Sequence, residues 1–167
     1  EGNNFYGLAP DIGFHEFCGD TFYVSAENGN DIHTGRSKDQ LLKSIGMAIN
    51  KSQNRDAIFV EQGEYAEELN LTETRFFYGG FSKGFAKNKT DLFPTRLKES
   101  VKISGDGIID GFYIDHGLGV AGGRYLVRQC RFGASETGIT AQKNDILDIR
   151  FCIFQRHQSA LSVTGQC

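Results

Sequence analysis

Two stretches of sequence decide the fold: YLVRQCRFGASETGITA at residues 125–141 and LDIRFCIFQRHQSALSV at residues 147–163. When the two stretches are aligned with a shift of 22 residues, residues of similar type occupy equivalent positions. The matching pairs are Val127 with Ile149, Arg128 with Arg150, Cys130 with Cys152, Phe132 with Phe154, and Ile139 with Leu161. A repeat of this length, with β-type alternation and no helix inside the unit, predicts a β-solenoid in which each coil covers its neighbour's apolar face.

A looser register extends the repeat backwards with a shift of 18 residues. It places Ile109 under Val127, Asp110 under Arg128, Phe112 under Cys130, and Ile114 under Phe132. Three consecutive coils are therefore visible, and stacked coils lie about 4.8 Å apart, as neighbouring strands in a sheet do. The sequence predicts an all-β, right-handed parallel β-helix.

Residues 37–50 interrupt this strand pattern, because apolar residues from Leu41 to Ile49 recur there at helical spacing. Ser37 with Gln40 three positions later forms a capping-box pattern. A solenoid needs its terminal sheet edges covered, so we expect a short N-terminal capping α-helix at about 37–50. The predicted organisation is a closing or linker segment at 1–20, with packing on a neighbouring unit as one option, and a parallel β-helix at 21–167 with coils from about 57.

Composition limits the possible partners. The net charge is -3 and the pI is about 5.8, so no basic excess is present to bind a nucleic acid backbone. No apolar run approaches the roughly 20 residues needed to cross a bilayer, which predicts no membrane insertion. The four cysteines lack C-x-x-C spacing, and neither a metal site nor a cofactor is expected.

Cysteines and sequons supply further expectations. Cys130 and Cys152 fall at inward positions of the repeat and are expected to form a buried stack of free thiols. Cys18 and Cys167 are the disulfide candidates, either with each other or between the ends of neighbouring units. Three N-x-S/T triplets, at Asn50, Asn70 and Asn88, are candidate glycosylation sites if the chain is secreted.

Several segments also resemble a known group of proteins. They are TFYVSAENGND from Thr21, the LLKSIGMAIN segment from Leu41, IFVEQGEYAEEL from Ile58, FYGGF from Phe77, and ISGDGIIDGFYI from Ile103. In content and order they resemble secreted right-handed parallel β-helix proteins of the pectin-lyase-like superfamily, especially large bacterial surface proteins. The resemblance implies an extracellular or cell-surface location. APDIGFHEF at residues 9–17 looks like the motif that closes such a β-helix on its C-terminal side, yet here it comes first.

Enzymes of this superfamily include polysaccharide lyases, so we sought a catalytic surface. Asp110, Arg128 and Arg150 are predicted to stack as an outward column that could grip the carboxylates of an acidic glycan. The alternative is a ladder of surface ion pairs. The column contains no lysine to act as a base and no acidic triplet to hold calcium, so no catalytic residue is assigned.

The leading hypothesis from sequence is a non-catalytic extracellular structural or adhesive β-helix that assembles end to end into a fibre or tandem array. The displaced closing motif, the terminal cysteines and the absence of a recognisable cap after Val163 motivate it; a piece cut from a longer solenoid explains these features as well. The alternatives are a fragment of a polysaccharide lyase or hydrolase, and a carbohydrate-binding module acting on acidic glycans.

Overall fold

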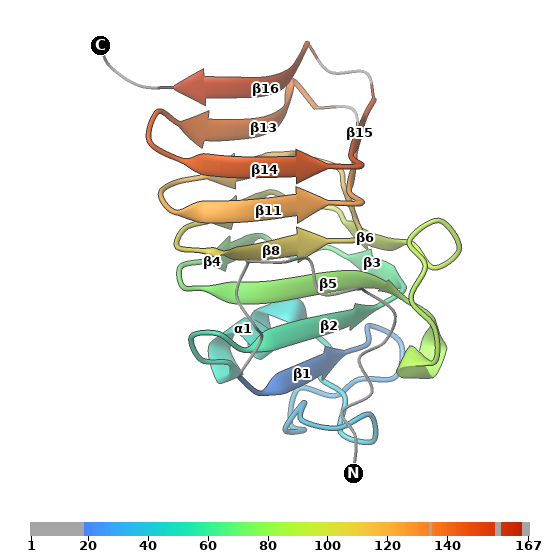
Figure 1. Cartoon of the computed structure of the whole chain (residues 1–167). Coiled ribbons are helices and arrows are strands. Elements are labelled where there is room, and N and C mark those ends of the chain that lie inside the picture. The colour runs from blue at the N-terminus through green and yellow to red at the C-terminus, as the bar shows by residue number, and fades with distance from the viewer. Residues whose placement is uncertain (1–18, 134, 156–157, 165–167) are drawn as a thin grey trace.

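The computed structural model describes residues 19–133, 135–155 and 158–164. It confirms the predicted fold class, because the strands form three parallel sheets that wind as a β-helix. In Figure 1 the front strands run left to right and the rear strands run back, while the chain rises from β1 to β16, so the winding is right-handed. The proposed closing segment at residues 9–17, together with Cys18 and Cys167, lies outside the described residues.

Each full coil contributes one strand to each sheet. Sheet A contains β1 (Thr21–Val24), β2 (Ala57–Glu61), β5 (Arg75–Phe81), β8 (Gly107–Asp110), β11 (Arg124–Arg128) and β14 (Ile146–Arg150). Sheet B contains β3 (Gly63–Tyr65), β6 (Thr95–Leu97), β9 (Phe112–Ile114), β12 (Arg131–Phe132) and β15 (Ile153–Phe154). Sheet C contains β4 (Leu69–Leu71), β7 (Val101–Ile103), β10 (Leu118–Val120), β13 (Thr137–Gln142) and β16 (Ser159–Thr164).

The sequence repeat corresponds to the strand register. Val127 pairs with Ile109 on one side and with Ile149 on the other, which are the shifts of 18 and 22 residues read from the sequence. The coil between β5 and β8 is longer because residues 82–94 leave the stack as an excursion that includes the 3-10 turn η1 (Lys83–Phe85). Figure 1 shows this excursion beside β5. Strands β5 and β8 keep a regular register across this insertion. The β2–β5 register shifts between Phe59 and Glu61, next to the point where the excursion begins.

The main core fills the interior of the coils. On sheet A the inward residues form one continuous column, and Phe77 stacks on Phe112 of sheet B with ring centroids 4.4 Å apart. The members of the sheet A column are Phe22, Ile58, Phe77, Ile109, Val127 and Ile149. Stacking like residues every strand lets each apolar side chain bury itself against the coils above and below.

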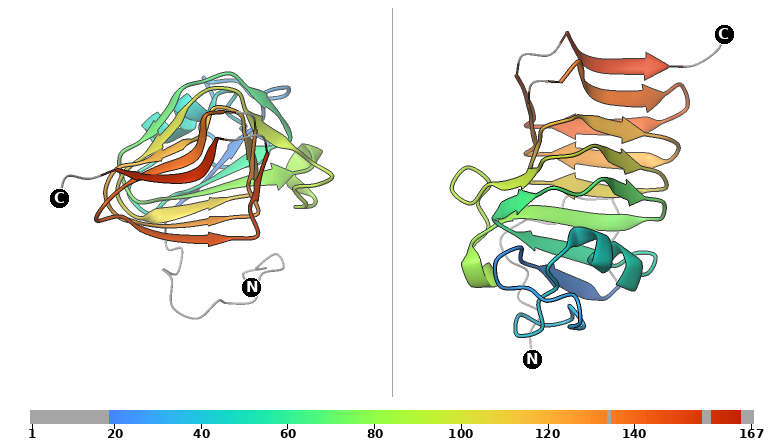
Figure 2. Two further views of the ribbon diagram at one scale, coloured as in Figure 1. Left: turned by 90° about the horizontal axis from the view of Figure 1, so that it is seen from above. Right: turned by 180° about the vertical axis from the view of Figure 1, so that it is seen from behind.

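The N-terminal end carries the expected capping helix, but the predicted bounds were wrong. Helix α1 spans Ile45–Lys51, and its N-cap is Ser44, whose side chain accepts from the Met47 amide. Leu42 does not continue the helix, because its amide donates to Tyr23 and its carbonyl accepts from Ser25. Backbone pairing to β1 therefore takes precedence over the helical spacing of residues 37–44. Figure 2, from behind, shows α1 at the N-terminal end of the stack.

Candidate functional site

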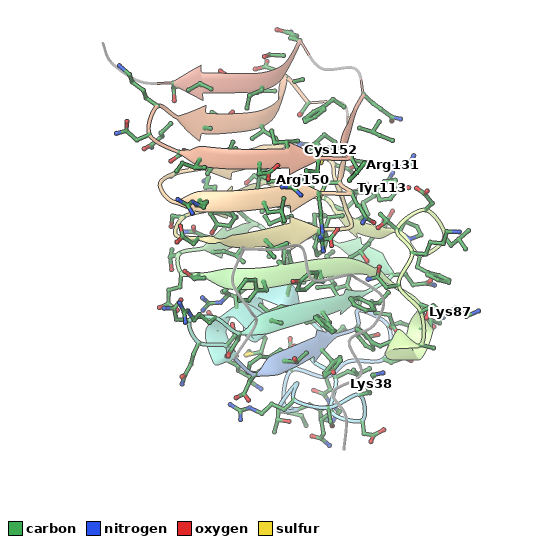
Figure 3. All side chains as sticks on the ribbon, in the orientation of Figure 1. Lys38, Lys87, Tyr113, Arg131, Arg150 and Cys152 are labelled. Carbon is green, nitrogen blue, oxygen red and sulfur yellow. The ribbon has the colours of Figure 1, made fainter. Side chains whose placement is uncertain are left out.

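The structure brings the predicted charged column together. Asp110, Arg128 and Arg150 occupy successive strands β8, β11 and β14, and each is the register partner of the next. Below Asp110 the same outward column continues through Tyr78 on β5 and Phe59 on β2. The lower half of the column is thus aromatic and the upper half is charged. Figure 3 labels Arg150 on the front face of the stack.

Asp110 and Arg128 form a largely buried ion pair. Nε of Arg128 donates to Oδ2 of Asp110 at 2.8 Å, and the side chains are only 16% and 9% exposed. The other carboxylate oxygen of Asp110, Oδ1, is buried without a hydrogen-bond partner. Burial raises the pKa of the Asp110 carboxyl group, and the Arg128 guanidinium opposes this rise. The pair is too enclosed to present a free guanidinium to a glycan.

Arg150 has a different partner. Its Nε donates to both carboxylate oxygens of Asp148 at 2.9 and 3.0 Å, and Nη2 donates to Oδ2 at 2.6 Å. These hydrogen bonds lower the pKa of Asp148. Both arginines of the column are therefore engaged by carboxylates of this chain, which favours an ion-pair ladder over a glycan grip.

Tyr78 adjoins the buried pair from below. Burial raises the pKa of Tyr78 to about 12, with a lowering influence from Arg128 and a raising one from Asp110. Its ring meets Phe59 edge-on, with centroids 5.4 Å apart. The phenol therefore stays neutral at physiological pH and serves as part of the packed surface beside the ion pair.

The acidic residues and the histidine of the segment GDGIIDGFYIDHG, residues 105–117, do not converge on one site. Asp106 accepts from the Arg124 amide at 2.7 Å and so shapes a turn. Asp115 pairs with Lys98 at 3.1 Å on the sheet B side. His116 is exposed. Across the ranges that the structure describes, no group of three or more His, Cys, Asp or Glu side chains is placed to hold a metal ion.

The three sequons differ in their surroundings. Asn50 and Asn70 are exposed, on α1 and on β4. Asn88 is exposed too, although its Nδ2 donates to the Gly79 carbonyl at 3.0 Å, and the hydroxyl-bearing Thr90 of that sequon is buried. Asn50 and Asn70 thus remain the more accessible candidates.

Cys130 and Cys152 stack inside the coils, next to register partners Arg131 and Ile153. Both are free thiols, Cys130 buried and Cys152 partly exposed. Burial and the hydrogen bond with Cys152 raise the pKa of Cys130 well above its usual value, whereas that hydrogen bond lowers the pKa of Cys152. The buried stack of thiols is therefore present, with unequal members.

Two features escaped the sequence reasoning. On sheet B, the Tyr113 ring lies between the guanidinium groups of Arg96 and Arg131, at 5.8 and 5.3 Å from the ring centroid. Figure 3 labels Tyr113 and Arg131 side by side. The 18-residue shift already placed Tyr113 under Arg131, so the signal for this cation–π ladder was present.

The second feature is an apolar column on the outer face of sheet A. Its members are Ala57, Phe76, Ile108 and Leu126. The signal was the unbroken apolar run AIFV at residues 57–60, since strands buried on both faces read as continuous apolar segments.

Comparisons with known proteins add no relative: no protein-family model, no curated protein and no solved structure matches the chain. Within the described residues, no helix combines the length and apolar character needed to cross a membrane. The class that the fold defines is the parallel β-helix.

Proposed function

We propose that this chain is a secreted, non-catalytic structural β-helix that assembles end to end through the face of its last coil. That last-coil face consists of the outer edges of β14, β15 and β16 with the inward side chains of these strands. The partner in this proposal is a second copy of the chain, which presents the same face. Secretion and the finer likeness to pectin-lyase-like surface proteins are parts of the proposal, supported by the sequence segments that resemble that group.

One observation carries the proposal: an inward column of sheet C loses its cover at the last coil. Four members, Leu69, Val101, Leu118 and Ile139, are at most 2% exposed. Leu161 stands next in the same column and is 45% exposed. Val163, in register with the buried Ala141, is 61% exposed. These inward side chains lack the next apolar layer that buries their counterparts in the coils below, which supports a partner that supplies one.

The edges of the sheets support the same conclusion. Each of the three sheets ends on a strand of the last coil, β14, β15 or β16. Sheet edges on which no further described strand lies, next to exposed apolar side chains, can act as a template for strand addition.

The opposite end of sheet A is occupied, which argues for a second copy meeting face to face. The outer edge of β1 is bonded by the cap: the Tyr23 amide donates to Gly35 at 2.8 Å, and the Leu42 amide donates to Tyr23 at 3.0 Å. A partner's last-coil face, by contrast, offers strand edges on which no further described strand lies. Two such faces would meet about a two-fold axis, with antiparallel pairing of their strands. Extension into a fibre would need a further contact at the N-terminal end.

The test is the oligomeric state of the chain across a concentration series, measured by size-exclusion chromatography with light scattering. We expect a dimer that dissociates on dilution, and electron micrographs of particles joined at their ends. The L161K/V163K variant should be monomeric, because two charges would be buried in the interface. Ser162→Lys is the matched control, since Ser162 alternates with these residues and faces outward with its partner Thr140.

A chain that stays monomeric at every concentration, or a control that dissociates as completely as the double variant, would contradict the proposal. The lyase and carbohydrate-binding alternatives have less support, because Arg128 and Arg150 are held by Asp110 and Asp148. A monomeric chain that released unsaturated ends from pectate, alginate or glycosaminoglycans would favour the lyase, and binding without such release would favour the binding module.

A further inference from the structure

The free thiols of Cys130 and Cys152 stand in successive coils at the same corner between sheet A and sheet B. Cys130 follows β11 and Cys152 follows β14, and the residues after them, Arg131 and Ile153, are register partners. Figure 3 labels Cys152 near the end of β14. One coil lower, the equivalent position holds Phe112. The two sulfur atoms therefore form a pair that joins only the last two coils.

Backbone hydrogen bonds fix the spacing of this pair on both sides. The Gln129 amide donates to the Arg150 carbonyl at 3.1 Å, and the Ile153 amide donates to the Cys130 carbonyl at 2.9 Å. These bonds hold the two cysteine Cα atoms at a strand spacing of about 4.8 Å. That spacing lies inside the range of about 4.4–6.8 Å found for disulfides. The separation that a disulfide needs is therefore already present in the folded chain.

Both cysteines follow the same kind of bend in the chain. Gln129 and Phe151, the residues just before them, have positive φ values of 50° and 55°. Sγ of Cys152 reaches toward the coil below and donates to the Val127 carbonyl at 3.5 Å. The side chains of Cys152 and Cys130 also hydrogen-bond to each other. The two sulfur atoms are thus direct neighbours.

The two thiols differ in solvent access and in acidity. Cys130 is buried, whereas Cys152 is partly exposed. The hydrogen bond with Cys130 lowers the pKa of Cys152, while burial raises the pKa of Cys130. The thiolate is the attacking species in thiol–disulfide exchange. Cys152 is therefore the thiol that reacts first with an oxidant, and Cys130 is the thiol placed to resolve the intermediate.

We propose that Cys130 and Cys152 form a reversible disulfide between the last two coils, with a small soluble disulfide such as oxidised glutathione as the oxidant. The Cys152 thiolate attacks one sulfur of the oxidant, forms a mixed disulfide and releases one glutathione thiolate. The Cys130 thiol gives its proton to that thiolate, and its sulfur then attacks Sγ of Cys152 and releases the second glutathione thiolate. The two cysteines lose two electrons and two protons, and the oxidant takes up both as two thiols. An excess of reduced glutathione reverses both steps.

The disulfide ties the last coil to the coil below it. Strands β14 and β15 lie on either side of Cys152, and each has a described neighbouring strand on one side only. A covalent link removes many of the open conformations that such strands otherwise reach. Oxidation is therefore expected to hold the last coil closed. The inference does not depend on end-to-end assembly, because the bond forms within one chain.

Oxidation of the full chain in a Cys18→Ser, Cys167→Ser background tests the proposal. The folded chain is incubated at high dilution with oxidised glutathione, and the remaining thiols are alkylated before mass spectrometry. We expect a product that has lost two hydrogen atoms, retains no glutathione and yields one peptide pair linked through Cys130 and Cys152. Cys130→Ser should keep one glutathione on Cys152, because no second thiol resolves the mixed disulfide. Cys152→Ser should stay reduced, because Cys130 is buried.

The same reaction in urea shows whether the fold is responsible for the bond. The mixed disulfide should close on the order of tenfold faster in the folded chain than in the unfolded one, because contact between the sulfurs gives a higher effective concentration than a flexible chain does. Equal closure rates, a persistent mixed disulfide on Cys152, a bond between two chains or a chain that stays reduced would each overturn the proposal. Peptide mapping of the oxidised wild-type chain replaces the mass measurement if the serine background does not fold.

Discussion

The two ends of the β-helix carry similar strands of sheet C, but the inward side chains are buried at one end and exposed at the other. Sheet C starts at β4 and ends at β16, and a leucine of one inward column stands on each. Leu69 of β4 is 1% exposed, whereas Leu161 of β16 is 45% exposed. The difference lies in what covers them, since α1 packs against β4. Burial of a solenoid residue is therefore decided by the next layer as much as by its own strand.

The cap at the N-terminal end is built from polar contacts as well as packing. The Glu67 carboxylate accepts from the amides of Ile45 and Gly46 at 2.9 and 2.8 Å. The Asp31 carboxylate accepts from the Lys43 and Ser44 amides, both at 2.9 Å. These acceptors satisfy backbone donors that a helix start and a covering loop would otherwise leave unpaired. The last-coil face lacks a comparable layer among the described residues.

The largest expected effect is a difference in stability loss between a substitution in the middle of the stack and one in the last coil. Phe77→Ala should lower the free energy of unfolding by about 3–5 kcal/mol, because the fully buried ring leaves a cavity beside Phe112. Phe154→Ala should cost only about 1 kcal/mol, because that ring stacks on Phe132 on one face and is partly exposed. Urea denaturation followed by circular dichroism measures both.

This measurement should be made at a concentration where the wild-type chain is monomeric, so that folding and assembly stay separate. Equal losses for the two variants would show that the last coil is covered in the monomer. That result would contradict the conclusion that the last coil is less covered than the rest of the stack.

A smaller effect distinguishes the two arginines of the charged column. Arg128→Ala should lower the free energy of unfolding by about 3 kcal/mol, because it leaves the buried Asp110 carboxylate without its counter-ion. Arg150→Ala should cause little measurable change, since its pair with Asp148 is exposed to solvent. Thermal and urea denaturation of both variants report the difference.

The double variant D110L/R128M provides the control. Replacing both buried charges with apolar side chains should restore most of the lost stability, because no uncompensated charge remains. If the double variant is as unstable as Arg128→Ala, the loss comes from packing of the arginine stem and not from the orphaned carboxylate.

The smallest effect concerns reactivity and leaves stability unchanged. In a Cys18→Ser, Cys167→Ser background, iodoacetamide at mildly alkaline pH should label Cys152 well before Cys130. The lowered pKa of Cys152 increases its thiolate fraction, while burial keeps Cys130 protonated and inaccessible. Mass spectrometry of the labelled peptides gives both rates. Equal labelling of the two cysteines under native conditions would mean that the last two coils open together.

Sequence reasoning succeeded where the signal was a direct repeat. The alignment of residues 125–141 with 147–163 reproduces the pairing of β11 with β14, of β12 with β15 and of β13 with β16. It also placed Asp110, Arg128 and Arg150 in one column. Stacked coils must keep their inward residues in register, so the register is written into the sequence itself.

It failed where two local structures competed for the same residues. The apolar spacing of 37–50 suits a helix, but the backbone of Leu42 pairs with β1 and postpones the helix start to Ile45. The spacing alone contains no information about a sheet edge that needs hydrogen-bond partners. A strand edge elsewhere in the chain decided which structure forms.

Sequence by itself determined the class of fold, the register of the later coils and the identity of the charged column, because each follows from similar residues that recur after 18 or 22 positions. Only the tertiary structure decided how those residues are used. It enclosed Asp110 with Arg128 but left Arg150 near the surface beside Asp148. It buried the outer apolar column and exposed Leu161. The physical reason is that burial and charge pairing depend on the layer of atoms next to a side chain, and that layer comes from distant parts of the sequence.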